Sequence, residues 1–140
     1  MKRVRKSPLP VALTIAVALF SVPMGHAEDK VKLTGDEIRE ILFTKGNVIY
    51  GVDHINNSVW IGTALGDGKR HFYWQHLSSK TPRAPFPNAG EITGTASVVG
   101  DQQCTKGYSE NRCFDLYRVG KDKYETWFGD TLQTTWYRAN

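Results

Sequence analysis

The strongest constraint on the fold is a succession of short segments rich in β-branched and aromatic residues, each followed by a turn signal. The segments are 47–52, 58–65, 70–77, 91–99, 113–119, 123–129 and 131–138. The turns between them include GDGK at 66–69 and GKD at 120–122. Short strands at this spacing are typical of an antiparallel sandwich or small barrel. The sequence therefore predicts a mainly β domain, an antiparallel meander of about seven strands.

One short helix is expected before the first of these strands, over residues 35–43. Thr34 and Glu37 have the spacing of a capping box, in which each residue satisfies a free backbone N–H of the other. An apolar stripe runs along one side of the helix and consists of Ile38, Ile41 and Leu42. A helix of two to three turns is not stable alone, so we expect this stripe to pack against the sheet.

The first 27 residues have the three-part pattern of a secretory signal peptide. Basic residues at 2–6 precede an apolar run at 11–22, and GHA at 25–27 provides small residues for cleavage. The run is shorter than the roughly 20 apolar residues that a membrane-spanning helix needs, and no later segment is apolar enough. We therefore expect residues 1–27 to be removed, leaving a single β-rich domain over 28–140 that is periplasmic or secreted.

Export changes the charge of the protein. The whole chain has 18 Lys and Arg against 14 Asp and Glu, but four of the basic residues lie in the leader. The expected mature domain therefore has 14 residues of each sign and no net charge when its histidines are neutral. Nucleic-acid binding needs a basic face, so we expect no nucleic acid among the partners.

Cys104 and Cys113 are the only cysteines of the chain. They enclose eight residues, whereas a C-x-x-C redox motif has two. Neither cysteine has a further Cys or a His beside it to build a zinc site. An even number of cysteines in an oxidising compartment favours a disulfide. We expect this disulfide to tie the end of one strand to the start of the next.

No group of residues predicts catalysis, a metal site or a cofactor. The histidines of the expected mature domain are His54, His71 and His76. The last two are five residues apart on one expected strand, so they point to opposite faces. The chain has no HExxH motif, phosphate-binding loop, dinucleotide fingerprint or nucleophile elbow. We therefore expect a protein that is not an enzyme.

Two regions are candidates for binding. Residues 78–90 hold all three prolines of the expected mature domain, which indicates a long surface loop. Its candidate contact residues are Lys80, Arg83 and Phe86. Phe86 is either an apolar anchor flanked by steering charges or a core residue that folds back.

The second candidate is the strand at 70–77, with His71, Tyr73 and Trp74 as its candidate binding residues. Strict alternation places Phe72, Trp74 and His76 on one face, and His71, Tyr73 and Gln75 on the other. We expect most of the aromatic side chains of the domain to form its core, because each buries a large apolar area.

Four stretches carry a resemblance to a known group of proteins. They are LTGDEI at 33–38, Trp60 with Asp67-Gly68, GTASVVGDQQC at 94–104 and RCFDLYRVGKDKY at 112–124. From Leu33 onward the chain resembles a loose family of small exported proteobacterial proteins of unassigned activity. Ala96 stands where that family usually has tryptophan. The resemblance implies export, a disulfide and a β-rich fold, and it supplies no catalytic residues.

The sequence favours an exported, soluble binding or interaction module of the cell envelope. Its ligand would be a protein, a glycan or a small apolar molecule, and a wide internal cavity would favour the small molecule. One alternative is an inhibitor of a host hydrolase such as lysozyme, acting through a projecting loop. The other is a minor subunit or stabiliser of an envelope complex.

Overall fold

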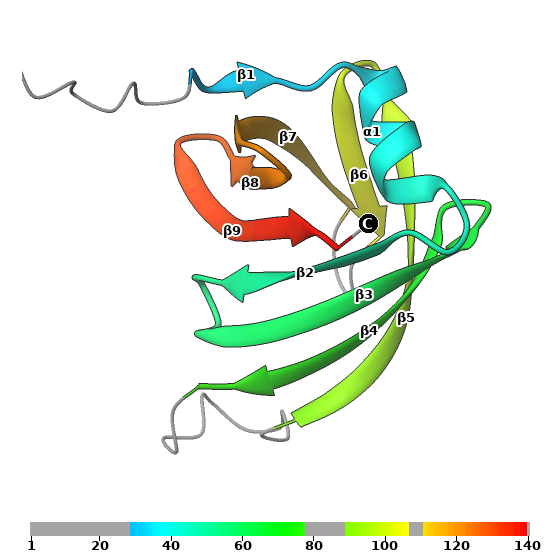
Figure 1. Cartoon of the computed structure of the whole chain (residues 1–140), viewed down its shortest axis with the longest axis vertical. Helices are drawn as coiled ribbons and strands as arrows, with labels where there is room; N and C mark the ends of the chain where they lie inside the picture. Colours follow the sequence, from blue (N-terminus) through cyan, green and yellow to red (C-terminus); the bar gives the residue numbers. More distant parts are fainter. Residues whose placement is uncertain (1–28, 78–88, 107–110, 140) are drawn as a thin grey trace, which may run out of the picture.

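The computed structural model describes residues 29–77, 89–106 and 111–139. They form nine strands and one helix (Figure 1). In chain order the elements are β1 (Val31–Lys32), α1 (Gly35–Phe43), β2 (Val48–Asp53), β3 (Ser58–Gly66), β4 (Lys69–His76), β5 (Ala89–Val99), β6 (Gln102–Lys106), β7 (Asn111–Gly120), β8 (Lys123–Phe128) and β9 (Thr131–Arg138). The expected signal peptide at 1–27 lies outside the described residues.

Strands β2 to β9 form a closed antiparallel barrel of eight strands (Figure 1). Each strand pairs with the next along the chain, and β9 pairs with β2 to close the ring. The two-residue strand β1 pairs with Tyr117 and Arg118 of β7, beyond the part of β7 that pairs with β6. The prediction of an antiparallel meander with one short helix is confirmed, and of the two architectures considered the barrel is the one that forms. Each of the eight strands therefore pairs with a neighbouring strand on both sides.

The barrel has one strand more than the sequence pattern indicates, because β6 is not recognisable from local sequence. Its sequence, QQCTK, is polar apart from Cys104 and shows no alternation of apolar and polar residues. The fold tolerates this because one face of β6 points to solvent and the other lines a partly polar interior. The predicted end of the loop at residue 90 is also wrong, because β5 already begins at Ala89.

Helix α1 closes one end of the barrel and contacts β3, β5 and β6. Its bounds agree with the prediction, and the capping box is present. The Thr34 hydroxyl accepts a hydrogen bond from the Glu37 N–H (3.3 Å), and the Glu37 carboxylate accepts one from the Thr34 N–H (2.9 Å). The bond from the Thr34 backbone is the main reason that the pKa of Glu37 lies below its ordinary value. Among the described residues, no helix is long and apolar enough to cross a membrane.

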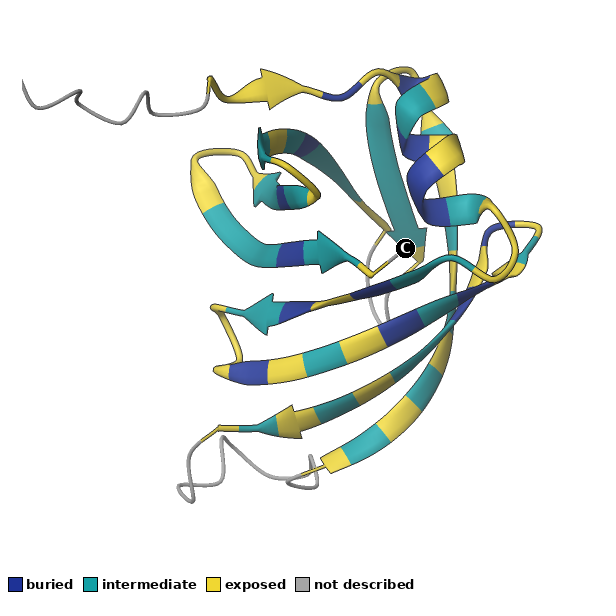
Figure 2. Ribbon diagram, in the orientation of Figure 1, coloured by how far each residue is buried: buried dark blue, intermediate teal, exposed yellow. Residues whose placement is uncertain are grey.

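The buried core is gathered at the helix end of the barrel. Its members are Leu33, Ile38, Ile41, Leu42, Ile49, Leu116, Tyr124 and Trp136. The burial colours of Figure 2 show dark blue on the side of α1 that faces the barrel and on the adjacent strands. Inward residues nearer the other end, such as Trp60 and Trp74, are only half-buried. The core therefore plugs one end of the barrel and leaves the remainder unfilled.

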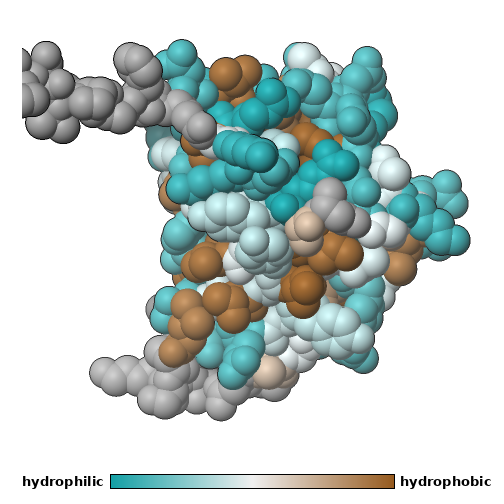
Figure 3. Space-filling view, in the orientation of Figure 1, coloured by the Kyte–Doolittle hydropathy of each residue, from teal (hydrophilic) through white to brown (hydrophobic). Residues whose placement is uncertain are grey.

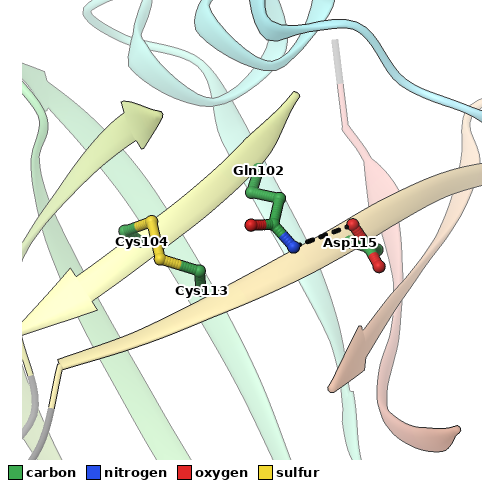
Figure 4. Close-up of a disulfide and its surroundings, with 4 residues drawn as sticks. All are labelled: Gln102, Cys104, Cys113 and Asp115. Atoms are coloured by element: carbon green, nitrogen blue, oxygen red, sulfur yellow. Dashed lines mark hydrogen bonds between the residues drawn. A yellow bond between two sulfur atoms is a disulfide. The ribbon is translucent and has the colours of Figure 1, made fainter. Parts of the chain in front are cut away.

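Cys104 of β6 and Cys113 of β7 form a disulfide (Figure 4). The two residues are directly opposite in register, with their Cα atoms 4.0 Å apart. Two positions along the same face, Gln102 donates a hydrogen bond to Asp115 (3.1 Å). The expected disulfide is confirmed, but it joins paired positions within two strands and not the end of one to the start of the next. The bridge lies on the outer face of the barrel.

Replacing both cysteines by serine should lower the free energy of unfolding by about 2–3 kcal/mol, because the short closed loop no longer restricts the unfolded chain. Urea denaturation of the oxidised protein and of the Cys104→Ser, Cys113→Ser variant measures this difference. The folded parent and the folded variant should have the same far-ultraviolet circular dichroism spectrum, since β6 and β7 remain paired in both. A variant as stable as the parent would contradict a stabilising role for the bridge.

The outer face of the barrel also holds β1 and one tryptophan. Lys32 forms a 2.8 Å ion pair with Asp115, and this hydrogen bond holds the pKa of Asp115 below its ordinary value. The ammonium of Lys30 lies 3.5 Å from the centroid of the Trp127 ring. Trp127 donates its indole N–H to Glu125 (2.8 Å). Trp127 is thus held outside the barrel by charged neighbours.

Candidate ligand-binding site

The alternation of β4 separates the interior of the barrel from its outer surface. Phe72, Trp74 and His76 point inward, whereas His71 and Tyr73 point outward, as the sequence predicts. The registers of β3 and β5 with β4 place Trp60 directly across from Trp74 and Ile92 across from Phe72. Inward side chains of neighbouring strands therefore meet inside the barrel at matching levels.

These inward side chains surround a cavity of about 810 Å³, which we call the lumen. Its wall reaches from Leu42 and Ile49 at the helix end to Asn56 and His76 at the opposite end. The aromatic residues of its wall are Trp60, Phe72, Trp74, Phe114 and Trp136. Eight strands give a barrel that either fills with side chains or holds one small ligand. The volume of the lumen lies within the roughly 300–1,000 Å³ that is usual for small-molecule sites.

Glycines on neighbouring strands explain why so many aromatic rings leave the lumen open. The pairs in register are Gly62 with Phe72, Gly90 with Trp74, and Gly51 with both Trp60 and Trp136. A Cβ added at Gly62 would collide with the ring of Phe72, and one at Gly90 would lie 2.9 Å from Trp74. These two rings therefore lie across the backbone of the adjacent strand, where a side chain would otherwise stand. They cover the wall instead of crossing the lumen.

Arg70 is the charged residue at the helix end of the lumen. It is buried, with only 5% of its surface exposed. Its Nε donates a hydrogen bond to the Leu42 carbonyl near the end of α1 (3.0 Å), and its guanidinium carbon lies 5.2 Å from the Phe43 ring centroid. The second terminal nitrogen, Nη2, is buried and has no hydrogen-bond partner. Burial lowers the pKa of Arg70 to about 10, so the group stays charged at neutral pH.

Further polar groups line the lumen between its two ends. Gln103 and Thr105 of β6 and Arg112 of β7 belong to its wall. At the end away from the helix, Nδ1 of His76 lies 3.1 Å from the Asn56 carbonyl oxygen, and its Nε2 is buried without a partner. The wall also includes the carboxylates Asp53 and Glu91. The lumen thus combines five aromatic side chains with many polar residues, and the greater part of its lining surface is apolar.

The predicted candidate residues do not form one site. His71 and Tyr73 lie on the outer surface, where His71 Nδ1 is 2.9 Å from the Thr93 hydroxyl and its Nε2 is 3.3 Å from Glu91. Trp74 belongs to the lumen. The candidate loop residues, Lys80, Arg83 and Phe86, lie outside the described residues.

Sequence reasoning missed Arg70, although a signal was available. Extending the alternation of the 70–77 segment back to its first residue puts Arg70 on the same face as Phe72 and Trp74. A charged residue on the inward face of a strand is costly to bury, so it merits a functional explanation. The aromatic neighbours on that face predict a core, and a buried core offers an arginine no role.

A second hollow, of about 650 Å³, lies on the outer face of β3, β4 and β5. Its wall includes Val59, Ile61 and Tyr73, which are all exposed to solvent.

Across the described ranges, no three His, Cys, Asp or Glu side chains lie close enough together to hold a metal ion. No family model, curated protein or solved structure matches this chain. The lumen is the best-formed site of the described residues because it combines enclosure with unpaired polar atoms.

Proposed function

We propose that this protein is an exported binding module that holds one small, largely apolar molecule inside its barrel. The observation that carries the proposal is the lumen of about 810 Å³, enclosed by an eight-stranded barrel whose core is confined to the helix end. An empty space of this size costs stability at its apolar walls, because their side chains lose the contacts that a ligand or other side chains would supply. The disulfide agrees with export, since such bonds persist in oxidising compartments.

The glycine and aromatic pairs support a binding role over a structural one. A barrel that needed only stability would gain from larger side chains at Gly62 and Gly90, with the aromatic rings turned to the centre. The sequence instead holds two rings against the wall through glycines on the next strand. Flat aromatic walls give a ligand a large contact area with little loss of side-chain freedom.

Gly94 offers a way to fill the lumen by one substitution. It faces inward on β5, directly opposite Arg70, and a Cβ built there meets no atom within 4 Å. Gly94→Leu should therefore be accommodated by the fold while its side chain occupies ligand space. Thr95→Leu is the matched control, because it places the same side chain on the outer face of the next residue.

The neutral apolar fluorophore N-phenyl-1-naphthylamine serves as the probe, since its emission rises in apolar surroundings. We expect delipidated parent protein and the Thr95→Leu variant to bind it saturably, at one molecule per barrel. Gly94→Leu should weaken this binding at least about tenfold, as expected when the ligand's contact volume is lost. Failure of the parent to bind, or equal binding by Gly94→Leu, would contradict a ligand site in the lumen.

The outer surface favours a second candidate, a protein-binding module of an envelope complex. Tyr50, Ile61 and Tyr73 are consecutive cross-strand partners on β2, β3 and β4, and all three are exposed. Figure 3 shows brown, apolar patches among the hydrophilic residues of one face of the molecule. Pull-down of the parent and of an Ile61→Lys variant from envelope extracts separates the two candidates. A partner lost only with Ile61→Lys would favour this outer face.

A further inference from the structure

We infer that the ligand is an amphipathic carboxylate whose head group binds Arg70 at the helix end of the lumen. This inference rests on the proposed function and adds the chemical class and the orientation of the ligand. It follows from three features of the lumen. Arg70 is a buried charge with an unpaired hydrogen-bond donor, small residues leave space beside it, and aromatic side chains line the wall beyond it.

Arg70 is a buried cation with no ion-pair partner among the described residues, although Asp53 and Glu91 also belong to the wall of the lumen. None of the ion pairs in the described part of the chain includes it, and its Nη2 makes no hydrogen bond. A buried charge is normally paired, because removing it from water costs several kcal/mol. An anion entering the lumen would supply both the missing charge and the missing acceptor.

A structural role at the end of α1 does not account for the whole side chain. The hydrogen bond from Nε to the Leu42 carbonyl satisfies one of the free carbonyls of the last helical turn. A neutral glutamine carries a donor that could serve this purpose without burying a charge. The guanidinium also has a fixed fork of donors that matches the two oxygens of a carboxylate. The unpaired Nη2 is the part of that fork left for a ligand.

Small residues on both sides leave room for a head group. Ala64 of β3 and Gly94 of β5 are the cross-strand partners of Arg70. Gly94 has open space where its side chain would be. A singly charged carboxylate would neutralise one guanidinium, whereas a doubly charged phosphate would leave a buried negative charge. The site therefore fits a carboxylate best.

The body of the ligand follows from the wall beyond Arg70. Along β4 the next inward residues are Phe72 and Trp74, and Trp60 and Ile92 face them from the neighbouring strands. These side chains favour an aliphatic or aromatic chain. The ligand would thus enter from the end opposite α1 with its apolar body against the aromatic wall and its carboxylate deepest.

The head-group preference is tested by displacing N-phenyl-1-naphthylamine with decanoate, decan-1-ol and decylamine. These three ligands have the same ten-carbon chain and differ only in the head group. We expect the parent to bind decanoate about 10- to 100-fold more tightly than decanol, the range given by one charge-assisted hydrogen bond. Decylamine should be the weakest. In Arg70→Gln the preference should fall to near unity through loss of decanoate binding alone. Arg70→Lys should keep part of it, since the charge remains.

Equal binding of decanoate and decanol by the parent would overturn the inference, as would a preference that survives in Arg70→Gln. Circular dichroism and fluorophore binding show whether each variant retains the barrel. If Arg70→Gln does not fold, the comparison of head groups on the parent decides the question without it. A parent that binds neither the fluorophore nor any of the three chains would instead refute the proposed function itself, so the two failures are distinguishable.

Discussion

Replacing Trp136 by alanine should lower the free energy of unfolding by about 3–5 kcal/mol, the usual cost of removing a large buried aromatic side chain. Trp136 is 2% exposed and joins the helix-end core to the floor of the lumen. Its ring stacks on Tyr124, with centroids 4.4 Å apart, and its indole N–H donates to the Thr126 hydroxyl (3.0 Å). The substitution removes apolar contacts and leaves Tyr124 and Thr126 without these partners.

Chemical denaturation followed by circular dichroism measures this loss without relying on tryptophan emission. Trp127→Ala is the matched control, because that ring lies on the outer face under Lys30. Its removal should cost less, about 1–2 kcal/mol, because the ring is only half-buried. If the two variants are equally stable, the barrel does not depend on the core around Trp136.

Replacing Ile41 by alanine should lower the free energy of unfolding by about 2–4 kcal/mol. Ile41 is 4% exposed and lies in the buried stripe of α1, which a nine-residue helix needs in order to stay folded. The substitution leaves a cavity between the helix and the end of the barrel. Because the neighbouring Leu42 lines the lumen, loosening of this end should also weaken ligand binding.

The control for this prediction is Glu40→Ala on the same helix. Glu40 is exposed, and alanine has the higher helix propensity, so its substitution should change stability by no more than about 0.5 kcal/mol. Urea denaturation of both variants gives the comparison. A loss below about 0.5 kcal/mol for Ile41→Ala would show that α1 is a peripheral arm and not a plug of the barrel.

Local sequence was sufficient to predict the helix and most strands, because their signals are local. The capping box of Thr34 and Glu37 and the apolar stripe of α1 depend on residues three or four positions apart. The alternation of β4 correctly separated Phe72 and Trp74 from His71 and Tyr73. The disulfide followed from the number of cysteines and the expected compartment.

The lumen could not be predicted, since it depends on register between distant strands. Whether Phe72 fills the barrel or covers its wall is decided by Gly62 on β3, and the pairing of the two is a property of the closed sheet. The strand β6 was missed for a related reason. Its inward residues Gln103 and Thr105 face a partly polar cavity, so no apolar pattern marks them.

Quenching of the intrinsic tryptophan emission by bromododecanoate tests ligand binding in the lumen most directly, because bromine quenches rings that it contacts. Three of the four tryptophans, Trp60, Trp74 and Trp136, line the lumen, and Trp127 lies outside it. We expect saturable quenching of most of the emission at one equivalent, retained in Trp127→Phe and lost in Gly94→Leu. An emission that bromododecanoate leaves unchanged, or a quenching that disappears with Trp127, would contradict a ligand inside the barrel.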